Sequence, residues 1–399
     1  MSGIRAPHLS IVTETYRPEI NGVAHTLARL TDRLRESGYR VSIVRPRQRA
    51  DGSVVPHDES LVRGLPVPGY AGVQVGLAWP RAIVRVWRAD PPDAVYVATE
   101  GPLGSAAVTA ARRLGIRVLS GFHTNFHSYS RHYGLGRLQP FVARWLAAFH
   151  RRTDGTFVAS ADIRDALRRE GVARVHVLGR GVDAALFTPE RRCRLLRATW
   201  GAVDEDVVAI YVGRMAAEKN LPLAIDAFRA IQAVAPTARF VLVGDGPARI
   251  ALERQHPDLM FVGVRTGDDL ARHYASADLF LFPSETDTFG NVTLEAMASG
   301  LAVVAFDYAA AHQHITHGHD GLLAPLGDAA AFVRLASRAA RQPDELAIVG
   351  ARARAHALTL EWDDIAARFA AVLLDDPRGG ARPQTVAPRH AVPRMEDAT

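Results

Sequence analysis

Residues 8–46 read HLSIVTETYRPEINGVAHTLARLTDRLRESGYRVSIVRP and predict one strand–helix–strand unit. The runs HLSIVTETY and RVSIVRP are typical of buried strands, and apolar residues between them recur at helical spacing until Gly38. Such a unit places two parallel strands side by side with the helix on one face of the sheet. Asn21, Gly22 and Val23 open this helix, so their backbone amides are expected at the carboxyl end of the first strand.

The same alternation continues through the chain and starts again after residue 187. We therefore predict an α/β protein with two doubly wound, Rossmann-like domains that face each other across a cleft. The expected parts are an N-terminal domain at 1–187, a C-terminal domain at 188–360, a helix at 361–376 returning toward the first domain, and a disordered tail at 377–399. The further expected strands are 93–99, 116–122, 155–160, 207–213, ARFVLVGDGP, LMFVGV, LFLFPS and LAVVAFD.

The charge of the chain is concentrated in its first half. Lys and Arg number 48 against 42 Asp and Glu, a net +6; residues 1–187 carry 26 − 15 = +11 and the remainder 22 − 27 = −5. A basic half favours an anionic partner such as a phospholipid, a nucleic acid or a phosphorylated metabolite, and the alternative is an ordinary solvated arginine surface. The single Cys193 excludes an internal disulfide, and without a signal-like or bilayer-length apolar stretch we expect a cytoplasmic protein.

Lys219 is the only lysine in the chain. Arg214 comes directly after the predicted strand 207–213, and Lys219 stands where the next helix begins. A guanidinium and an ammonium converging there would suit a diphosphate, because arginine binds phosphate oxygens bidentately and lysine acts as a point charge. The alternative is two surface charges at a helix start.

A second group of polar residues follows the predicted strand LFLFPS. Asn291 is expected to cap a helix that Gly300 ends, with Asp287 in the preceding loop and Glu295 in the first turns. Free amides at this helix start, with Gly290 allowing close approach, would bind an anion beside two carboxylates. A ligand with both a phosphate and a polyol would use all of these groups.

Several common cofactor and metal motifs are missing or incomplete. The first turn lacks G-x-G-x-x-G, and the only lysine is followed by asparagine, which excludes a P-loop. His123 and His127 have the spacing of a zinc site but lack the glutamate of a metalloprotease. We interpret His312, His314, His317 and His319 as part of a solvated loop. Asp204-Glu-Asp206 comes just before a predicted strand, so we interpret it as a turn. We predict no metal site and no cofactor, and we expect His123, at the end of strand 116–122, to point inward.

These motifs, in this order, resemble the retaining glycosyltransferases of family four, which have the two-domain glycosyltransferase-B fold. The resemblance runs from about residue 9 to 375 and depends on GRMAAEKN, VGDGP, Asp287-x7-Glu295 followed by AMASG, and GRGVD at 179–183. NGV at 21–23 and GFHTNFHSYSRHYGLG at 121–136 look most like bacterial α-mannosyltransferases and glycolipid synthases.

The resemblance implies roles for individual residues. Arg214 and Lys219 would bind the donor diphosphate, Glu295 the ribose and Asp287 the hexose hydroxyls, although the family usually has Glu where this chain has Asp287. Gly22 would lie under the phosphates, and His123 would contact the hexose or the acceptor. The other donor-binding positions are Val264, Gly290, Asn291 and Val292.

The resemblance also implies a reaction. We expect metal-independent, retaining transfer of a hexose, mannose or glucose, from a GDP- or UDP-linked donor to a lipid-linked or glycolipid acceptor. Alternatives are a soluble or polysaccharide acceptor, a nucleotide-sugar epimerase, and a basic nucleic-acid-binding protein, which no reader motif supports. Aromatic residues at helical spacing among arginines, Phe141, Trp145 and Phe149 as well as Trp79, Ile83 and Trp87, suit either core packing or peripheral contact with an anionic membrane at its inner face.

Overall fold

The computed structural model describes residues 5–19, 21–48, 51, 55–66, 74–123, 139–287 and 289–375, with the side chains of 139–143 excepted. The predicted tail at 377–399 and His127 lie outside the described residues. The chain forms two compact units, one of residues 1–121, 149–156 and 366–399 and the other of residues 122–148 and 157–365. The domain limits expected from the sequence, at 187 and 360, stay a prediction.

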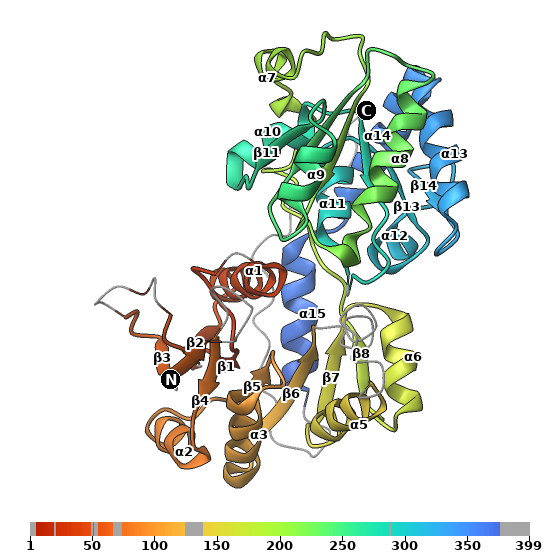
Figure 1. Cartoon of the computed structure of the whole chain (residues 1–399). Helices are drawn as coiled ribbons and strands as arrows, with labels where there is room; N and C mark the ends of the chain where they lie inside the picture. The colour runs from red at the N-terminus through yellow and green to blue at the C-terminus, as the bar shows by residue number, and fades with distance from the viewer. Residues whose placement is uncertain are drawn as a thin grey trace, which may run out of the picture. The chain divides into compact units, whose positions relative to one another are not determined.

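The first sheet has eight strands in the order β4-β3-β2-β1-β5-β6-β7-β8 (Figure 1). β1 pairs in parallel with both β2 and β5, so the predicted strand–helix–strand unit at 8–46 is confirmed. β3 and β4 pair antiparallel at the edge and were not expected from the sequence. The strands are β1 His8–Val12, β2 Arg40–Pro46, β3 Glu59–Pro66, β4 Gln74–Leu77, β5 Ala94–Val97, β6 Arg117–Phe122, β7 Gly155–Val158 and β8 Val175–Val177.

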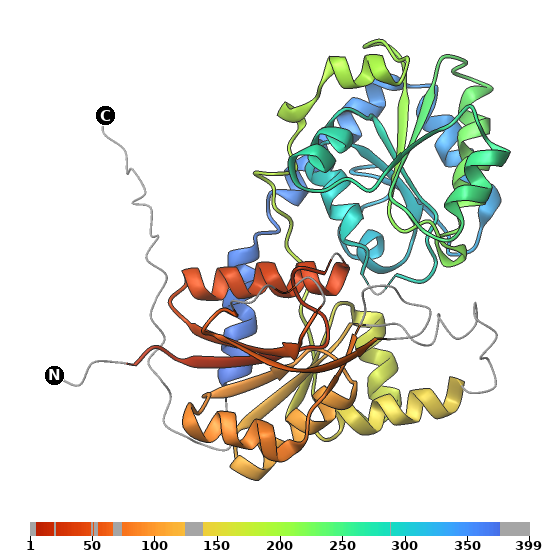
Figure 2. The same ribbon diagram turned by 60° about the vertical axis from the view of Figure 1, so that its left-hand side comes forward.

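Helices cover both faces of this sheet, as the turned view in Figure 2 also shows. Val95 and Val97 of β5 pack with α2 and α3, whereas Tyr96 between them has its ring 4.9 Å from that of Phe369 in α15. This alternation follows from the two-residue period of a strand, and burial on both faces explains why the strand sequences are almost continuously apolar. The helices of this part are α1 Gly22–Glu36, α2 Pro80–Ala89, α3 Pro102–Leu114, α5 Gln139–His150, α6 Ala161–Arg169 and α15 Trp362–Leu374.

The two arginine-rich aromatic helices divide their aromatic residues between core and surface. Ile83 and Trp87 of α2 are buried in the core beneath α3, but Trp79 at the start of α2 is 82% exposed. In α5, Phe149 is buried and Trp145 is half exposed. Core packing and surface exposure therefore both occur on each helix. Within the described ranges, no helix combines the length and the apolar character needed to cross a bilayer.

The second sheet has six parallel strands in the order β11-β10-β9-β12-β13-β14. α8 packs against α13 on one face and α11 against α14 on the other (Figure 1). The prediction of an α/β chain with two doubly wound parallel sheets is thus confirmed. The elements are β9 Val208–Val212, α8 Leu221–Gln232, β10 Arg239–Val243, α9 Arg249–Gln255, β11 Met260–Gly263, α10 Gly267–Ala275, β12 Leu279–Phe282, α11 Asn291–Ala298, β13 Ala302–Phe306, α12 Ala309–His314, β14 Leu322–Ala324, α13 Ala329–Ala340 and α14 Pro343–Ala357, preceded by α7 Arg194–Thr199.

Candidate active site

The strand order of the second sheet indicates where a ligand would bind. The chain runs outward from β9 to β10 and β11, returns to the other side of β9 as β12, and continues to β13 and β14. Ligands of doubly wound sheets bind at the carboxyl ends of the strands where this direction reverses, which here are β9 and β12. Arg214 and Lys219 follow β9, and Asp287 and Gly290 follow β12. The sequence predicted these four residues separately, and the topology brings their loops to one edge.

The VGDGP segment, Val243 to Pro247, supports the loop that carries Arg214. A Cβ added at Gly244 would lie 2.0 Å from the carbonyl oxygen of Gly213, and one at Gly246 would lie 2.4 Å from that of Met215. The Met215 amide also donates to the Asp245 carbonyl at 2.9 Å. These glycines therefore permit backbone-to-backbone packing between two strand ends, which fixes the position of the loop after β9.

Lys219 forms an ion pair with Asp287. Its Nζ lies 2.6 Å from Asp287 Oδ1, and the two side chains are only 14% and 18% exposed. Lys219 ends a 3₁₀ turn, Ala217–Lys219, and α8 begins two residues later at Leu221. The Lys219 ammonium also lies 5.9 Å from the ring centre of Phe282, the last residue of β12. The only lysine of the chain is thus held at the reversal point of the sheet.

Arg214 lies beside a buried carboxylate. Its Nη1 is 4.0 Å from Oε1 of Glu218, a residue that is 2% exposed, while the Arg214 side chain itself remains 42% exposed. The hydroxyl of buried Tyr211 donates to the Arg214 carbonyl at 3.0 Å. Burial, with Asp287 and Glu218 nearby, raises the pKa of Tyr211 well above its ordinary value, so this hydroxyl stays a donor. Arg214 therefore combines a fixed backbone with a guanidinium accessible to a ligand.

The helix after β12 begins differently from the prediction. Gly290, with φ 91°, occupies the N-cap position of α11, and Asn291 is the first helical residue and not the cap. The reason is that the left-handed backbone needed before α11 favours glycine over asparagine. Asp287 lies in the preceding loop and Glu295 one turn into the helix, as expected.

Tyr274 is a residue of this site that the sequence interpretation missed. It is fully buried in α10, and its hydroxyl donates to Glu295 Oε2 at 3.0 Å. Burial and the Glu295 carboxylate raise the pKa of Tyr274 well above its usual range. The hydrogen bond fixes the orientation of Glu295. An amphipathic helix with an inward aromatic residue gave no signal of this role.

The remaining donor-binding positions lie near these loops. Val264 directly follows β11 and is 55% exposed. Val292 and Asn291 are half-buried in the first turn of α11, and the Val292 carbonyl lies 3.5 Å from the Tyr274 hydroxyl. Their contacts with a donor stay a prediction.

Gly22 begins α1 at the carboxyl end of β1, as predicted. The Asn21 side chain caps the helix by accepting from the Ala24 amide at 2.9 Å. Among the described residues outside its own turn of helix, a Cβ at Gly22 would meet no atom within 4 Å. Packing against the described residues therefore does not require a glycine here, and a ligand contact with the amides of this helix start stays a prediction.

His123 follows β6 and is half-buried. Its Nδ1 lies 3.2 Å from Nη2 of Arg180, a buried residue of the GRGVD segment. A guanidinium can only donate, so Nδ1 is the acceptor and the neutral imidazole carries its proton on Nε2. Arg180 is thus a second residue that sequence reasoning did not assign to the site.

Two carboxyl groups at the first sheet were also not singled out. Glu14 follows β1 and Glu100 follows β5, the strands between which that sheet reverses direction. Burial, with a contribution from Glu100, raises the pKa of Glu14 to about 7, although its Oε1 accepts from the Leu103 amide at 3.2 Å. Oε1 of buried Glu100 lies 3.4 Å from Nε2 of buried His150.

The acidic motif and the histidine run were interpreted from the sequence as a turn and a solvated loop, and the structure agrees with only part of this. Asp206 accepts from the Val203 amide at 2.8 Å in a turn before β9, which confirms the turn at 204–206. The expected solvated histidine loop is partly wrong, because His312 and His314 belong to α12 and burial lowers the pKa of His314 to about 4. Across the residues that the structure describes, no three His, Cys, Asp or Glu side chains gather as metal ligands would.

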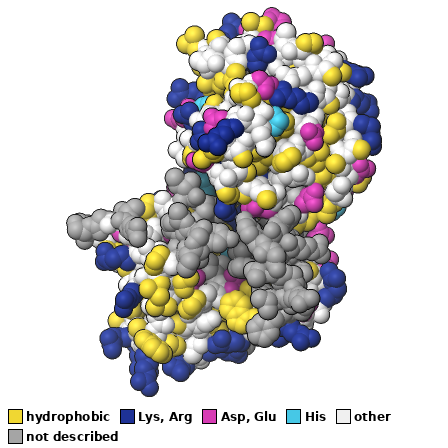
Figure 3. Space-filling model, in the orientation of Figure 1, with side chains coloured by type: hydrophobic (Ala, Val, Ile, Leu, Met, Phe, Trp, Pro, Cys, Tyr) yellow, Lys and Arg dark blue, Asp and Glu magenta, His cyan; other side chains and the backbone are white. Residues whose placement is uncertain are grey.

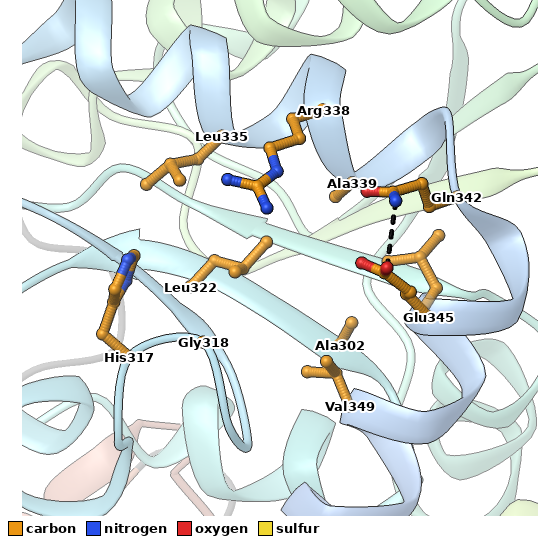
Figure 4. A pocket seen from close by; sticks show the side chains of 11 residues that line it. Ala302, His317, Gly318, Leu322, Leu335, Arg338, Ala339, Gln342, Glu345 and Val349 are labelled. Carbon is orange, nitrogen blue, oxygen red and sulfur yellow. Dashed lines mark hydrogen bonds between the residues drawn. The ribbon is translucent and has the colours of Figure 1, made fainter.

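A hollow of about 120 Å³ lies at the amino ends of strands β13 and β14 of the second sheet, opposite the carboxyl ends that carry the candidate site. It is lined by the first residues of β13 and β14, Ala302 and Leu322, and by side chains of α13 and α14 (Figure 4). Its polar residues include Arg338 and Glu345, and Glu345 accepts from Gln342 at 2.9 Å. The hollow therefore belongs to the amino ends of the strands and is separate from the residues predicted to bind the donor.

Comparison with known families agrees with this geometry. Residues 20–186 match the family described as Glycosyltransferase Family 4, and residues 206–342 match Glycosyl transferases group 1. A GDP-mannose-dependent alpha-mannosyltransferase of Mycobacterium tuberculosis is 33% identical over 82% of this chain and 85% of its own length. An alpha-monoglucosyldiacylglycerol synthase of Streptococcus pneumoniae is 27% identical over 74% of this chain and 70% of its own.

Solved structures show the same architecture. Sucrose-phosphate synthase from Thermosynechococcus elongatus superimposes with a TM-score of 0.76 at 18% identity, covering 92% of this chain and 98% of the other. That likeness concerns the fold, whereas the M. tuberculosis relative is similar in sequence over most of both chains. The resemblance drawn from GRMAAEKN, VGDGP and Asp287-x7-Glu295 is thereby confirmed, and the chain is a glycosyltransferase of family 4.

Proposed function

We propose that this protein transfers mannose from GDP-mannose to a lipid-linked or glycolipid acceptor, with retention of anomeric configuration and without a metal ion. The observation that carries the proposal is the ion pair of Lys219 with Asp287 at the reversal point of the second sheet, where Arg214 also follows the end of β9. The name of the M. tuberculosis relative supports GDP-mannose, and the name of the pneumococcal relative supports a lipid acceptor.

The chemistry follows from where charge develops. Breaking the bond between the sugar and the diphosphate places negative charge on the departing phosphate, and fixed cations stabilise that charge without reorganisation. Arg214, with its exposed guanidinium, and Lys219 would perform this task, which is why the proposal requires no metal ion. The acceptor oxygen would bond to the anomeric carbon on the face from which the phosphate departs, and the departing phosphate would accept the acceptor's hydroxyl proton. Attack on that same face retains the configuration.

A thermal-shift screen tests the donor site. GDP, UDP, ADP and NAD are each added with magnesium or with EDTA, to the wild type and to Lys219→Ala. We expect GDP to raise the melting temperature equally in both buffers, and the shift to vanish in the variant. Stabilisation by NAD alone, or by no nucleotide, would contradict the proposed donor, and a strict need for magnesium would contradict the metal-independent route.

A transfer assay tests the reaction itself. GDP-[¹⁴C]mannose is incubated with a lipid extract, with a polysaccharide fraction and with no acceptor. We expect label only in the lipid phase, an α-linkage by NMR, and a loss of at least about a thousandfold in Lys219→Ala. Label in the polysaccharide fraction would mean that the acceptor is a polysaccharide and not a lipid. Release of free sugar or an epimer without acceptor would indicate an epimerase.

Peripheral membrane contact at the cytoplasmic face is part of the proposal. Leu77 at the end of β4, Trp79 just before α2 and Val86 in α2 are exposed. Arg81 and Arg85 are exposed on the same helix. Figure 3 shows basic and hydrophobic side chains interspersed over the region where Figure 1 places α2 and β3. Arginines around exposed apolar groups suit an anionic lipid surface.

Vesicle sedimentation tests this contact. Wild type should bind vesicles of anionic phosphatidylglycerol in preference to phosphatidylcholine, and Trp79→Ser should reduce the binding several-fold. Leu195→Ser, which changes a residue of α7 that is 80% exposed, is the matched control. Equal loss in both variants, or binding to DNA in place of vesicles, would contradict the membrane contact.

A further inference from the structure

Asp287 forms an ion pair with Lys219, the cation that a diphosphate would need. Lys219 Nζ lies 2.6 Å from Asp287 Oδ1, and neither side chain is more than one-fifth exposed. The ring centre of Phe282 lies 5.9 Å from the ammonium. A phosphate that binds Lys219 therefore competes with Asp287 for the same positive charge, in surroundings where solvent screens little.

The second oxygen of the Asp287 carboxylate can still accept a hydrogen bond. Among the described residues, Asp287 Oδ2 is buried and has no hydrogen-bond partner. An ionised carboxylate accepts only, so a ligand that satisfies this oxygen must bring a donor such as a hydroxyl. A buried acceptor left without a donor costs roughly 1–3 kcal/mol.

The substrate and the product of the proposed reaction differ in their negative charge and in the hydroxyl donors that they can offer to Asp287. A nucleotide-sugar carries sugar hydroxyls next to its diphosphate, and these can donate to Asp287 while the phosphates bind Lys219. The free nucleoside diphosphate has no such hydroxyls, and its terminal phosphate gains a further negative charge because its second pKa is about 6. Asp287 thus attracts one ligand and repels the other.

We infer that Asp287 determines specificity between nucleotide-sugar and nucleoside diphosphate: it binds the sugar of the substrate and, once the sugar has left, recaptures Lys219 and weakens the binding of the product. This inference rests on the proposed function, since it takes the diphosphate to bind at Lys219. It gives Asp287 a role in product release in addition to its predicted contact with the hexose.

Calorimetric titration with GDP and with GDP-mannose tests the inference. Asp287→Asn should bind GDP about tenfold more tightly than the wild type, because Lys219 is no longer neutralised, and should bind GDP-mannose no more tightly than before. Its turnover should fall while inhibition by added GDP becomes stronger. Asp287→Glu, which keeps the charge, should retain the preference for GDP-mannose.

Two controls identify the cause. Glu285→Gln removes an exposed carboxylate two residues away, whose Oε1 lies 3.5 Å from Asn220 Nδ2, and should leave both affinities unchanged. In a Lys219→Met background, where GDP binding is already weak, Asp287→Asn should tighten it far less than it does beside the lysine, since recapture of the ammonium is then impossible. Circular dichroism and thermal unfolding show that each variant is folded.

The outcomes separate the two proposals. If the wild type binds GDP and Asp287→Asn binds it equally or more weakly, the inference is wrong and the donor site stands. If Glu285→Gln tightens GDP binding as much as Asp287→Asn does, the effect is one of general charge and the inference is again wrong. If the folded wild type binds neither GDP nor GDP-mannose, the proposed function fails and the inference fails with it.

Discussion

At the residue scale, the positions of the site's charged groups depend on buried partners that the sequence motifs do not identify. Arg214 was expected from its place after a strand, and the structure adds Glu218 beside it and Tyr211 beneath its carbonyl. His123 was expected to point inward, and the structure adds Arg180, which fixes its tautomer. Tyr211 and Glu218 lie within four residues of Arg214, but no motif marks them as its partners. Arg180, in contrast, is 57 residues from His123 and is brought to it by the fold.

Tyr274→Phe is predicted to impair donor binding more than turnover. The change removes the hydroxyl that donates to Glu295 at 3.0 Å and leaves the ring packing intact. We expect the KM for the donor to rise roughly tenfold with kcat nearly unchanged, and stability to fall by about 1 kcal/mol. Steady-state kinetics and urea unfolding measure these quantities.

A double-mutant cycle decides whether the effect passes through Glu295. If Tyr274 acts by orienting that carboxylate, Tyr274→Phe should have little further effect on the KM of Glu295→Gln. Additive changes in KM would mean that Tyr274 influences the donor by another route.

At the element scale, glycines allow the strand-end loops of the second sheet to pack closely. The segment after β10 fits against the segment after β9 only where side chains are missing, and the segment after β12 enters α11 through a left-handed glycine. The sequence marked these glycines as motif residues, but their partners became evident only when the strands were placed side by side.

Gly244→Ala is predicted to destabilise the second unit and to weaken donor binding together. The new Cβ would lie 2.0 Å from the Gly213 carbonyl oxygen, and the φ of 131° is unfavourable for alanine. A loss of at least about 2 kcal/mol in unfolding free energy is expected. Gly327→Ala is the control, since its φ is 81° but a Cβ there meets no atom of the described part of the chain within 4 Å. Equal losses in the two variants would refute the role of backbone packing.

At the scale of the whole molecule, the first sheet contains a carboxyl group that opposes folding at neutral pH. Burial and Glu100 raise the pKa of Glu14 to about 7 from 4.5. A carboxyl with a raised pKa in the folded state contributes its full stability below pH 4.5, and this contribution is lost as the pH rises through 7.

Glu14→Gln is therefore predicted to flatten the pH dependence of stability between pH 5 and pH 8. At pH 8 the variant should be more stable than the wild type by about 1–3 kcal/mol, and below pH 4.5 the difference should be small. Urea unfolding across this pH range measures it, with Glu36→Gln on the surface of α1 as the control. An unchanged slope in Glu14→Gln would show that this carboxyl ionises normally.

The sequence by itself determined the alternation of strands and helices, the two doubly wound sheets, the family, and the loops that carry Arg214, Lys219 and Asp287. These features are local, because the period of apolar residues and the glycines at strand ends are visible within a few residues. Only the tertiary structure decided that Lys219 contacts Asp287, that Tyr274 orients Glu295, and that Glu14 lies near Glu100. Each of these contacts joins residues that are distant in the chain, and the order of strands in the sheet, which no local period encodes, brings them together.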